Sequence, residues 1–159
     1  PGMAFERWEH AQVSVPAPRG DLRRAGLPDL DDLVAADTLA SRVGRRVLLQ
    51  SFLQRPGTQA WISADGQGFV IARAGRRAAQ VGPLVAADEA AAATLLQQAL
   101  AGLHGPVFLD LPQRWRTLAA DLGERGFRLQ RPFVRMARGD APALAGSEHL
   151  FVLAGPEFG

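Results

Sequence analysis

Residues 80–103 read QVGPLVAADEAAAATLLQQALAGL, and the spacing of their apolar side chains changes once along this stretch. The apolar run that ends at Ala86 predicts a buried β-strand. Gly82-Pro83 interrupts this run, so we expect a bulge or a splayed edge there, because proline has no N–H to donate within a sheet. From Asp88 onward, apolar residues recur at helical spacing and alanines are frequent. The stretch therefore predicts a strand that leads directly into a helix.

The start of this helix is the first candidate binding site. A strand that leads into a helix N-terminus often binds a phosphate group in α/β proteins, because the free N–H groups of the first turn point outward. Here Asp88 and Glu89 stand in the first turn, where negative charge complements the helix dipole. The residues thus pose the question of whether the helix start binds a phosphate or is satisfied by its own acids.

Length and composition limit the class of protein. The chain has 159 residues, 47% of them hydrophobic, which predicts one domain with one core. No apolar run reaches about 18 residues and no secretory signal is recognisable, so we expect a cytoplasmic protein with no membrane partner. Cysteine is absent and the three histidines are far apart in the sequence, so we expect no metal site.

The calculated pI of about 10.8 does not by itself indicate nucleic-acid binding. All 18 basic residues are arginine, and lysine, tyrosine and cysteine are absent, so almost nothing titrates between neutrality and the guanidinium range. The net charge is only +2. Because no helix-turn-helix is predicted either, we expect no nucleic-acid partner.

The order of predicted elements is helix, helix, three antiparallel strands, helix, strand, helix and two strands. Residues 1–22 are expected to be a strand and linker, either the end of an upstream domain or a cloning remnant, and residues 23–159 the main domain. The two closing strands, near residues 127–137 and 149–155, are expected to pair as a hairpin. The apolar faces of the first two helices are predicted from Leu30, Leu33, Val34 and Leu39, and from Val47, Leu48 and Phe52.

This order and four of its segments resemble the GNAT acetyltransferase superfamily. The segments are QVGPLVA at 80–86, the helix after it, GPVFLDLP at 105–112 and LAADLGERGF at 118–127. The resemblance covers the chain from about Arg23 to the end and is greatest to the C-terminal GNAT-like domain of bacterial proteins with two such domains. It implies an α/β fold with a twisted mixed sheet of about six or seven strands and helices on both faces. A V-shaped cleft is expected where the meander splays from the VFLDLP strand.

The resemblance also implies a cofactor, acetyl-CoA. Its pantetheine chain would contact the main chain of Leu84, Val85 and Ala86. Its pyrophosphate would lie at a Q/R-x-x-G-x-G/A motif at the helix start. The positions of this sequence that match the motif are Ala87, Asp88, Ala90 and Ala92.

Only Ala92 conforms to that motif. The motif needs glycines so that backbone N–H groups can approach phosphate oxygens closely, whereas this chain has Cβ atoms there. Asp88 and Glu89 also introduce charge of the same sign as the phosphates. We therefore expect a degraded pyrophosphate site.

The catalytic residues that the resemblance implies are also missing. Many GNAT enzymes have a tyrosine as general acid at the position that is Leu122 here, and this chain has no tyrosine. Asp110, at the end of VFLDLP, is a weak candidate for the base that deprotonates an incoming amine. The alternative role for Asp110 is a cap for the helix that follows Pro112.

Two groups of arginines are candidates for phosphate binding. Arg73, Arg76 and Arg77 lie near a hairpin tip, and a second group near the end of the chain comprises Arg125, Arg128, Arg131, Arg135 and Arg138. Solvated surface charge is the favoured role of both groups, and phosphate binding stays open as the alternative.

Two functions remain open from the sequence. The first is acetyl-CoA-dependent N-acetyl transfer to an unknown amine. The second is a non-catalytic GNAT-like domain with a structural, regulatory or ligand-binding role beside a catalytic GNAT domain, either upstream in the same polypeptide or in a homo-oligomer. We favour the first for the whole polypeptide and the second for this stretch of it.

Overall fold

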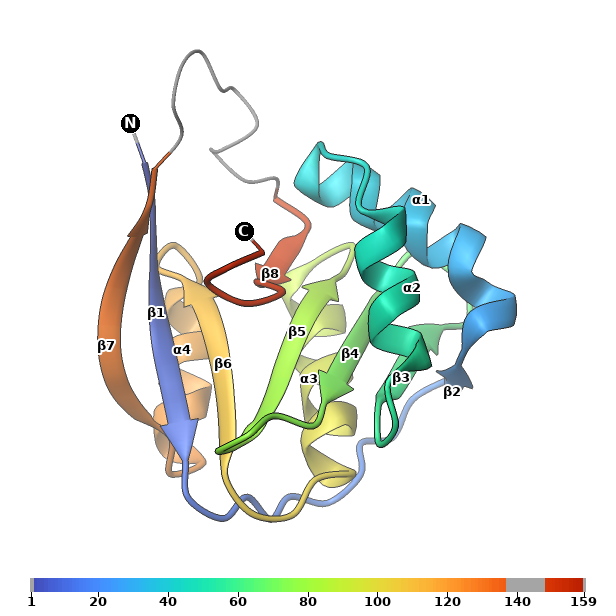
Figure 1. Ribbon diagram of the computed structural model, residues 1–159. Helices are drawn as coiled ribbons and strands as arrows, with labels where there is room; N and C mark the ends of the chain where they lie inside the picture. The colour runs from blue at the N-terminus through green and yellow to red at the C-terminus, as the bar shows by residue number, and fades with distance from the viewer. Residues whose placement is uncertain (1, 137–147, 159) are drawn as a thin grey trace.

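The computed structural model describes residues 2–136 and 148–158, which form one mixed sheet covered on both faces by helices (Figure 1). The strands are arranged in the order β2-β3-β4-β5-β6-β1-β7, and β8 pairs with β5 beside this path. Helices α1 and α2 lie on one face and α3 and α4 on the other (Figure 1). Each face buries its own group of apolar side chains. The predicted α/β architecture is confirmed.

The sheet has eight strands, not six or seven. The strand that the sequence did not reveal is β2 (Leu22–Ala25), which pairs antiparallel with β3 (Gln59–Ser63) at the edge of the sheet. Its four residues, LRRA, include two exposed arginines. So short and polar a segment shows no alternation of apolar and polar residues from which a strand could be predicted.

The N-terminal strand β1 (Met3–His10) lies inside the sheet, antiparallel to both β6 (Val107–Pro112) and β7 (Arg128–Arg135). Phe5 is buried, and its ring stacks on that of Phe133 with the centroids 5.0 Å apart. Residues 3–10 therefore share one sheet with the domain predicted for residues 23–159.

Helix α1 (Leu30–Ser41) follows a short 3-10 turn, η1 (Leu27–Asp29), and α2 (Arg46–Gln54) follows α1. The predicted apolar faces are partly wrong, because Leu39 is 72% and Val47 is 82% exposed. In α2 the buried residues are Leu49 and Phe52. Val47 precedes Leu49 by two residues, which places it about 200° around the helix axis from Leu49, toward solvent.

The meander predicted for the middle of the chain is confirmed. β3, β4 (Phe69–Arg73) and β5 (Ala79–Val85) pair antiparallel in sequence order. In the turn between β3 and β4, the Oδ1 atom of Asp65 accepts hydrogen bonds from the Ser63 hydroxyl and the Gln67 N–H. Gly66 has a φ of +72°, which a glycine adopts without strain.

The second half of the chain follows β5 with α3 (Glu89–Ala101), β6, α4 (Arg116–Glu124), β7 and β8 (Leu150–Val152). The predicted hairpin of the last two strands is wrong, because β7 pairs with β1 whereas β8 pairs with β5. β7 is the edge strand beyond β1, whereas β8 lies at the opening between β5 and β6.

Leu122 on α4 is 1% exposed and packs within the core between α3, α4 and the sheet. We expect Leu122→Ala to lower the free energy of unfolding by about 2–3 kcal/mol, near the low end for such truncations, because the groove between α3 and α4 lets neighbours relax. Urea denaturation would measure this change. Leu129→Ala is the matched control, since Leu129 is 49% exposed. Equal losses in the two variants would contradict a packing role for Leu122.

Candidate functional site

The site that the sequence indicated lies where β5 separates from β6. The two strands pair in parallel only from Ala79 to Val81 on β5, opposite Val107 to Leu109 on β6. Beyond Gly82-Pro83, β5 leaves β6, as the proline predicted. From there β8 takes the place of β6 beside β5, with Leu84 opposite Val152 and Val85 opposite Leu150, while β4 stays paired on the other side.

β8 fills this opening and is bonded to both of its sides. On the β5 side, the Ala86 N–H donates to the carbonyl oxygen of His149 at 3.1 Å. On the β6 side, the Leu153 N–H donates to the carbonyl oxygen of Asp110 at 2.9 Å. The V-shaped cleft expected between the two strands is therefore occupied by the protein's own chain (Figure 1).

Side-chain contacts hold β8 in the opening. Phe151 is buried, and its ring stacks on that of Trp115 with the centroids 4.2 Å apart. The Trp115 indole N–H donates to the carbonyl oxygen of Leu150 at 2.8 Å. The backbone approach is also close, because a Cβ built on Gly82 would lie 1.9 Å from the carbonyl oxygen of Leu153. β8 is thus an integral part of the core.

The start of α3 is capped by its own side chain. Asp88 is the N-cap residue, and its Oδ1 atom accepts a hydrogen bond from the Ala91 N–H at 2.8 Å. Glu89 adds a second carboxylate in the first turn. An N-cap carboxylate satisfies a donor that an anion would otherwise bind and complements the helix dipole. These contacts agree with the alternative in which the N–H groups at the helix start bond to acidic side chains of the same helix start.

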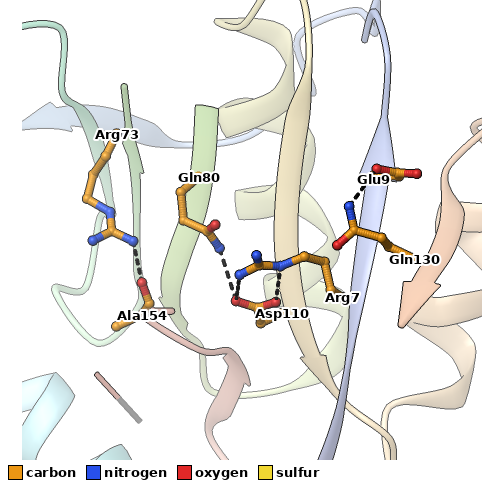
Figure 2. A network of polar contacts seen from close by, with 7 residues as sticks. All are labelled: Arg7, Glu9, Arg73, Gln80, Asp110, Gln130 and Ala154. Carbon is orange, nitrogen blue, oxygen red and sulfur yellow. Dashed lines mark hydrogen bonds and ion pairs between the residues drawn. The ribbon is translucent and has the colours of Figure 1, made fainter. Parts of the chain in front are cut away.

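Asp110 is fully buried and forms an ion pair with Arg7 (Figure 2). The Nε and Nη2 atoms of Arg7 donate to its two carboxylate oxygens, each at 2.9 Å, and Gln80 donates to the second oxygen at 3.3 Å. These donors stabilise the charged carboxylate and occupy both oxygens. These contacts favour a structural role for Asp110 over that of a base for an amine. It does not cap α4 either, which starts at Arg116.

Sequence reasoning missed the partner of Asp110, because Arg7 is 103 residues away in the chain. Arg7 also lies over the rings of Phe108 and Phe133. The only available signal was an arginine between the aromatic residues Phe5 and Trp8 of the expected strand, where burial would require a carboxylate partner.

A cavity of about 410 Å³ lies at the end of β5, where Val85 and Ala86 are among its lining residues. It is lined by Asp32 and Leu39 of α1, Asp65 of the β3–β4 turn, and by Ala87 and His149 among others. The Ser63 hydroxyl and the Gln67 N–H lower the pKa of Asp65, which keeps its carboxyl ionised at neutral pH. No arginine lines this cavity among the described residues. It therefore suits a neutral or cationic group better than a phosphate.

The second group of arginines lies along the end of α4 and β7. Arg131 lies over the ring of Phe133, 4.6 Å from its centroid, and burial lowers the pKa of Arg135. Arg125 and Arg128 are exposed, and Arg138 lies outside the described residues. The described members of the group do not converge on one cavity.

Comparison with known proteins identifies the family. A family model of the acetyltransferase (GNAT) domain matches residues 34–152. The chain belongs to the GNAT acetyltransferase family. A search of curated proteins finds no match.

Solved structures share the GNAT fold at low sequence identity. A candidate acetyltransferase from Pyrococcus horikoshii matches with a TM-score of 0.74 and 18% identity over 96% of this chain. This chain spans 50% of the Pyrococcus chain. A candidate GNAT acetyltransferase from Novosphingobium aromaticivorans has a TM-score of 0.62 and 14% identity, over 84% of this chain and 63% of its own. A GCN5-related N-acetyltransferase from Kribbella flavida has a TM-score of 0.56 and 22% identity, over 84% of this chain and 36% of its own.

Acetyl-CoA, the cofactor that the GNAT fold generally binds, does not fit the positions that the family resemblance assigns to it here. The structure brings Leu84, Val85 and Ala86 to the opening, but their main chain pairs with β8 and His149. Val85 and Ala86 also line the cavity at the end of β5. Of the motif positions, Ala87 follows β5, Asp88 caps α3, and Ala90 and Ala92 lie within α3. Ala92 is fully buried.

Two further sequence expectations concern a metal and a membrane. Among the described residues, no group of three or more His, Asp or Glu side chains is placed to bind a metal ion. The helices of the same part of the chain are all too short or too polar to cross a membrane.

Proposed function

We propose that this GNAT domain belongs to an acetyl-CoA-dependent N-acetyltransferase polypeptide but does not itself transfer the acetyl group. The observation that supports the proposal is the position of β8 between β5 and β6. β8 and His149 pair with the main chain of Leu84, Val85 and Ala86, which the pantetheine chain would contact. The capped start of α3 removes the phosphate-binding end of the same site.

Under this proposal the domain supports a catalytic GNAT domain, located upstream in the same polypeptide or in a second copy of the protein. The resemblance to C-terminal domains of tandem GNAT proteins favours the first arrangement. The acyl acceptor would then be an amine that the catalytic domain selects.

A second candidate function is the binding of a small amine in the 410 Å³ cavity at the end of β5. Asp32 and Asp65 supply two carboxylates to this cavity, and Leu39 and the alanines of α1 supply an apolar wall. Carboxylates at the rim of an apolar cavity are the groups that recognise an ammonium.

Calorimetric titration with acetyl-CoA tests the main proposal. We expect the unaltered domain to bind with a dissociation constant at or above about 100 μM. The sequence alone would predict that Asp88→Gly with Glu89→Lys tightens binding by roughly five- to a hundred-fold, because it removes charge near the phosphates. Since β8 still fills the opening, we instead expect less than about fivefold tightening.

Asp21→Gly with Glu124→Lys is the matched control, because it makes the same change of charge at two exposed positions outside this region. Low-micromolar binding by the unaltered domain would contradict the proposal. So would acetyl transfer to a panel of amines by the domain alone, at a rate above that of a preparation lacking it.

A further inference from the structure

A second cavity lies at the other end of β5, beside the turn between β4 and β5. Its volume is about 270 Å³, and its lining includes the arginines Arg55, Arg73, Arg76 and Arg77. Glu157 is the one acidic residue among its described lining residues. The lining thus carries four positive charges and one negative charge.

Arg73 forms the buried part of this cavity and is only 4% exposed. Its guanidinium lies over the ring of Phe52, 3.8 Å from the centroid, and 5.5 Å from that of Phe158. Its Nη2 atom donates to the carbonyl oxygen of Ala154 (Figure 2). Burial, and then the charge of Arg55, lower the pKa of Arg73 to about 10.

The buried guanidinium has unused hydrogen-bonding capacity. Its Nε atom is buried and has no hydrogen-bond partner among the described residues. None of the ion pairs of this part of the chain includes Arg73. The charges of Glu157 and Asp110 offset only part of the effect of burial on the pKa of Arg73. A buried cation without an ion-paired partner is costly, and buried polar groups are ordinarily paired. Arg73 thus lines the cavity and has a buried Nε–H without a partner in the described part of the chain, and these two observations together point to an anionic ligand.

The rim of the cavity supplies further guanidinium groups from a tight turn. A Cβ built on Gly75 would lie 2.2 Å from the carbonyl oxygen of Ala78, so the turn that carries Arg76 and Arg77 is closely folded. Both arginines are exposed, as is Arg55 at the end of α2. These three residues also lack an ion pair within the described chain. The side chains of Arg76 and Arg77 are available to a bound anion, whereas Arg55 lies over the ring of Phe52, 5.3 Å from its centroid.

We infer that this cavity binds a small ligand through an oxyanion, a phosphate or a carboxylate group, with Arg73 beneath it and Arg76 and Arg77 above it. Guanidinium groups donate in pairs to such oxygens and remain charged at all physiological pH values. Anchoring the C-terminal segment through Ala154 accounts for one donor of Arg73, but not for its free Nε–H or for three more arginines around it. The inference is independent of the proposed function, because it concerns neither β8 nor the start of α3.

Titration of the isotopically labelled domain with inorganic phosphate, and separately with citrate, tests the inference by nuclear magnetic resonance. We expect the Arg73 Nε–H resonance to shift on saturation, because that proton gains an acceptor. The fitted dissociation constant should be in the low millimolar range or tighter at low salt and should weaken as salt rises. Stronger binding of phosphate or of citrate identifies which oxyanion the cavity prefers, and either result supports the inference.

Arg76→Gln with Arg77→Gln should weaken binding at least about tenfold, and the fold should persist because both residues lie in an exposed turn. Arg19→Gln with Arg125→Gln is the matched control. These exposed arginines lie on the α3 and α4 face, where Gly20 approaches Thr94 and Arg125 ends α4. We expect the control to change binding by less than about twofold. An unshifted Arg73 resonance, or equal weakening in both double variants, would overturn the inference.

Discussion

Gly82→Ala is expected to lower the free energy of unfolding by more than about 4 kcal/mol, or to prevent folding. Gly82 has a φ of +135°, a conformation open to glycine alone, which costs an alanine about 1–3 kcal/mol. The new Cβ would also lie 1.9 Å from the carbonyl oxygen of Leu153, so the chain after β8 must move. Moving it uncovers at least one buried side chain of β8, at about 2–5 kcal/mol each.

Gly44→Ala is the control for this experiment, because a Cβ on Gly44 would meet no atom within 4 Å. We expect it to change stability by less than about 1 kcal/mol. Urea denaturation followed by circular dichroism compares the two variants. If Gly82→Ala cost less than about 1 kcal/mol, β8 would not lie between β5 and β6 in solution, and the proposal of a closed cofactor slot would fail with it.

Asp110→Ala is expected to lower the free energy of unfolding by about 3–5 kcal/mol. Removing the carboxylate leaves the Arg7 guanidinium, whose side chain is 11% exposed, without its counter-ion. Asp31→Ala is the comparison, because the Asp31–Arg46 pair is exposed at both ends and such pairs contribute at most about 1 kcal/mol.

Replacing both partners distinguishes the cost of an unpaired buried charge from the contribution of the ion pair itself. Arg7→Met with Asp110→Leu should cost less than Asp110→Ala alone, because no uncompensated charge remains in the core. Chemical denaturation at neutral pH measures all three variants. An Asp110→Ala loss as small as that of Asp31→Ala would show that Asp110 is free, which would restore it as a candidate base.

Only those features of the candidate site that depend on neighbouring residues in the chain could be predicted from the sequence. The strand ending at Val85, the helix starting at Glu89 and the capping Asp88 all follow from spacing and side-chain chemistry within a few residues. Whether the main chain from Leu84 to Ala86 is free depends on β8, which lies more than sixty residues further along the chain.

The sequence by itself determined the middle of the fold, because each of its elements has a local signal. The β3–β4 turn has Asp65 and Gly66, the break in β5 has Pro83, and α3 has its alanines. Only the tertiary structure decided where the first and last strands lie. A short apolar segment such as LFV could pair with any strand, because its pattern does not identify a partner. Its position depends on which strand edge the rest of the sheet leaves open.

The same reason explains the two arginines that the structure reveals. From the sequence alone, an arginine in a strand is predicted to be a surface charge, because the residues that surround it in the fold are not known. Arg7 is mostly shielded from solvent where it faces Asp110 on the neighbouring strand, and Arg73 is buried beneath Phe52 and Phe158. These contacts join residues far apart in the chain. Composition and spacing therefore determined the sheet and its helices, and long-range packing determined which of their groups remain free to bind a ligand.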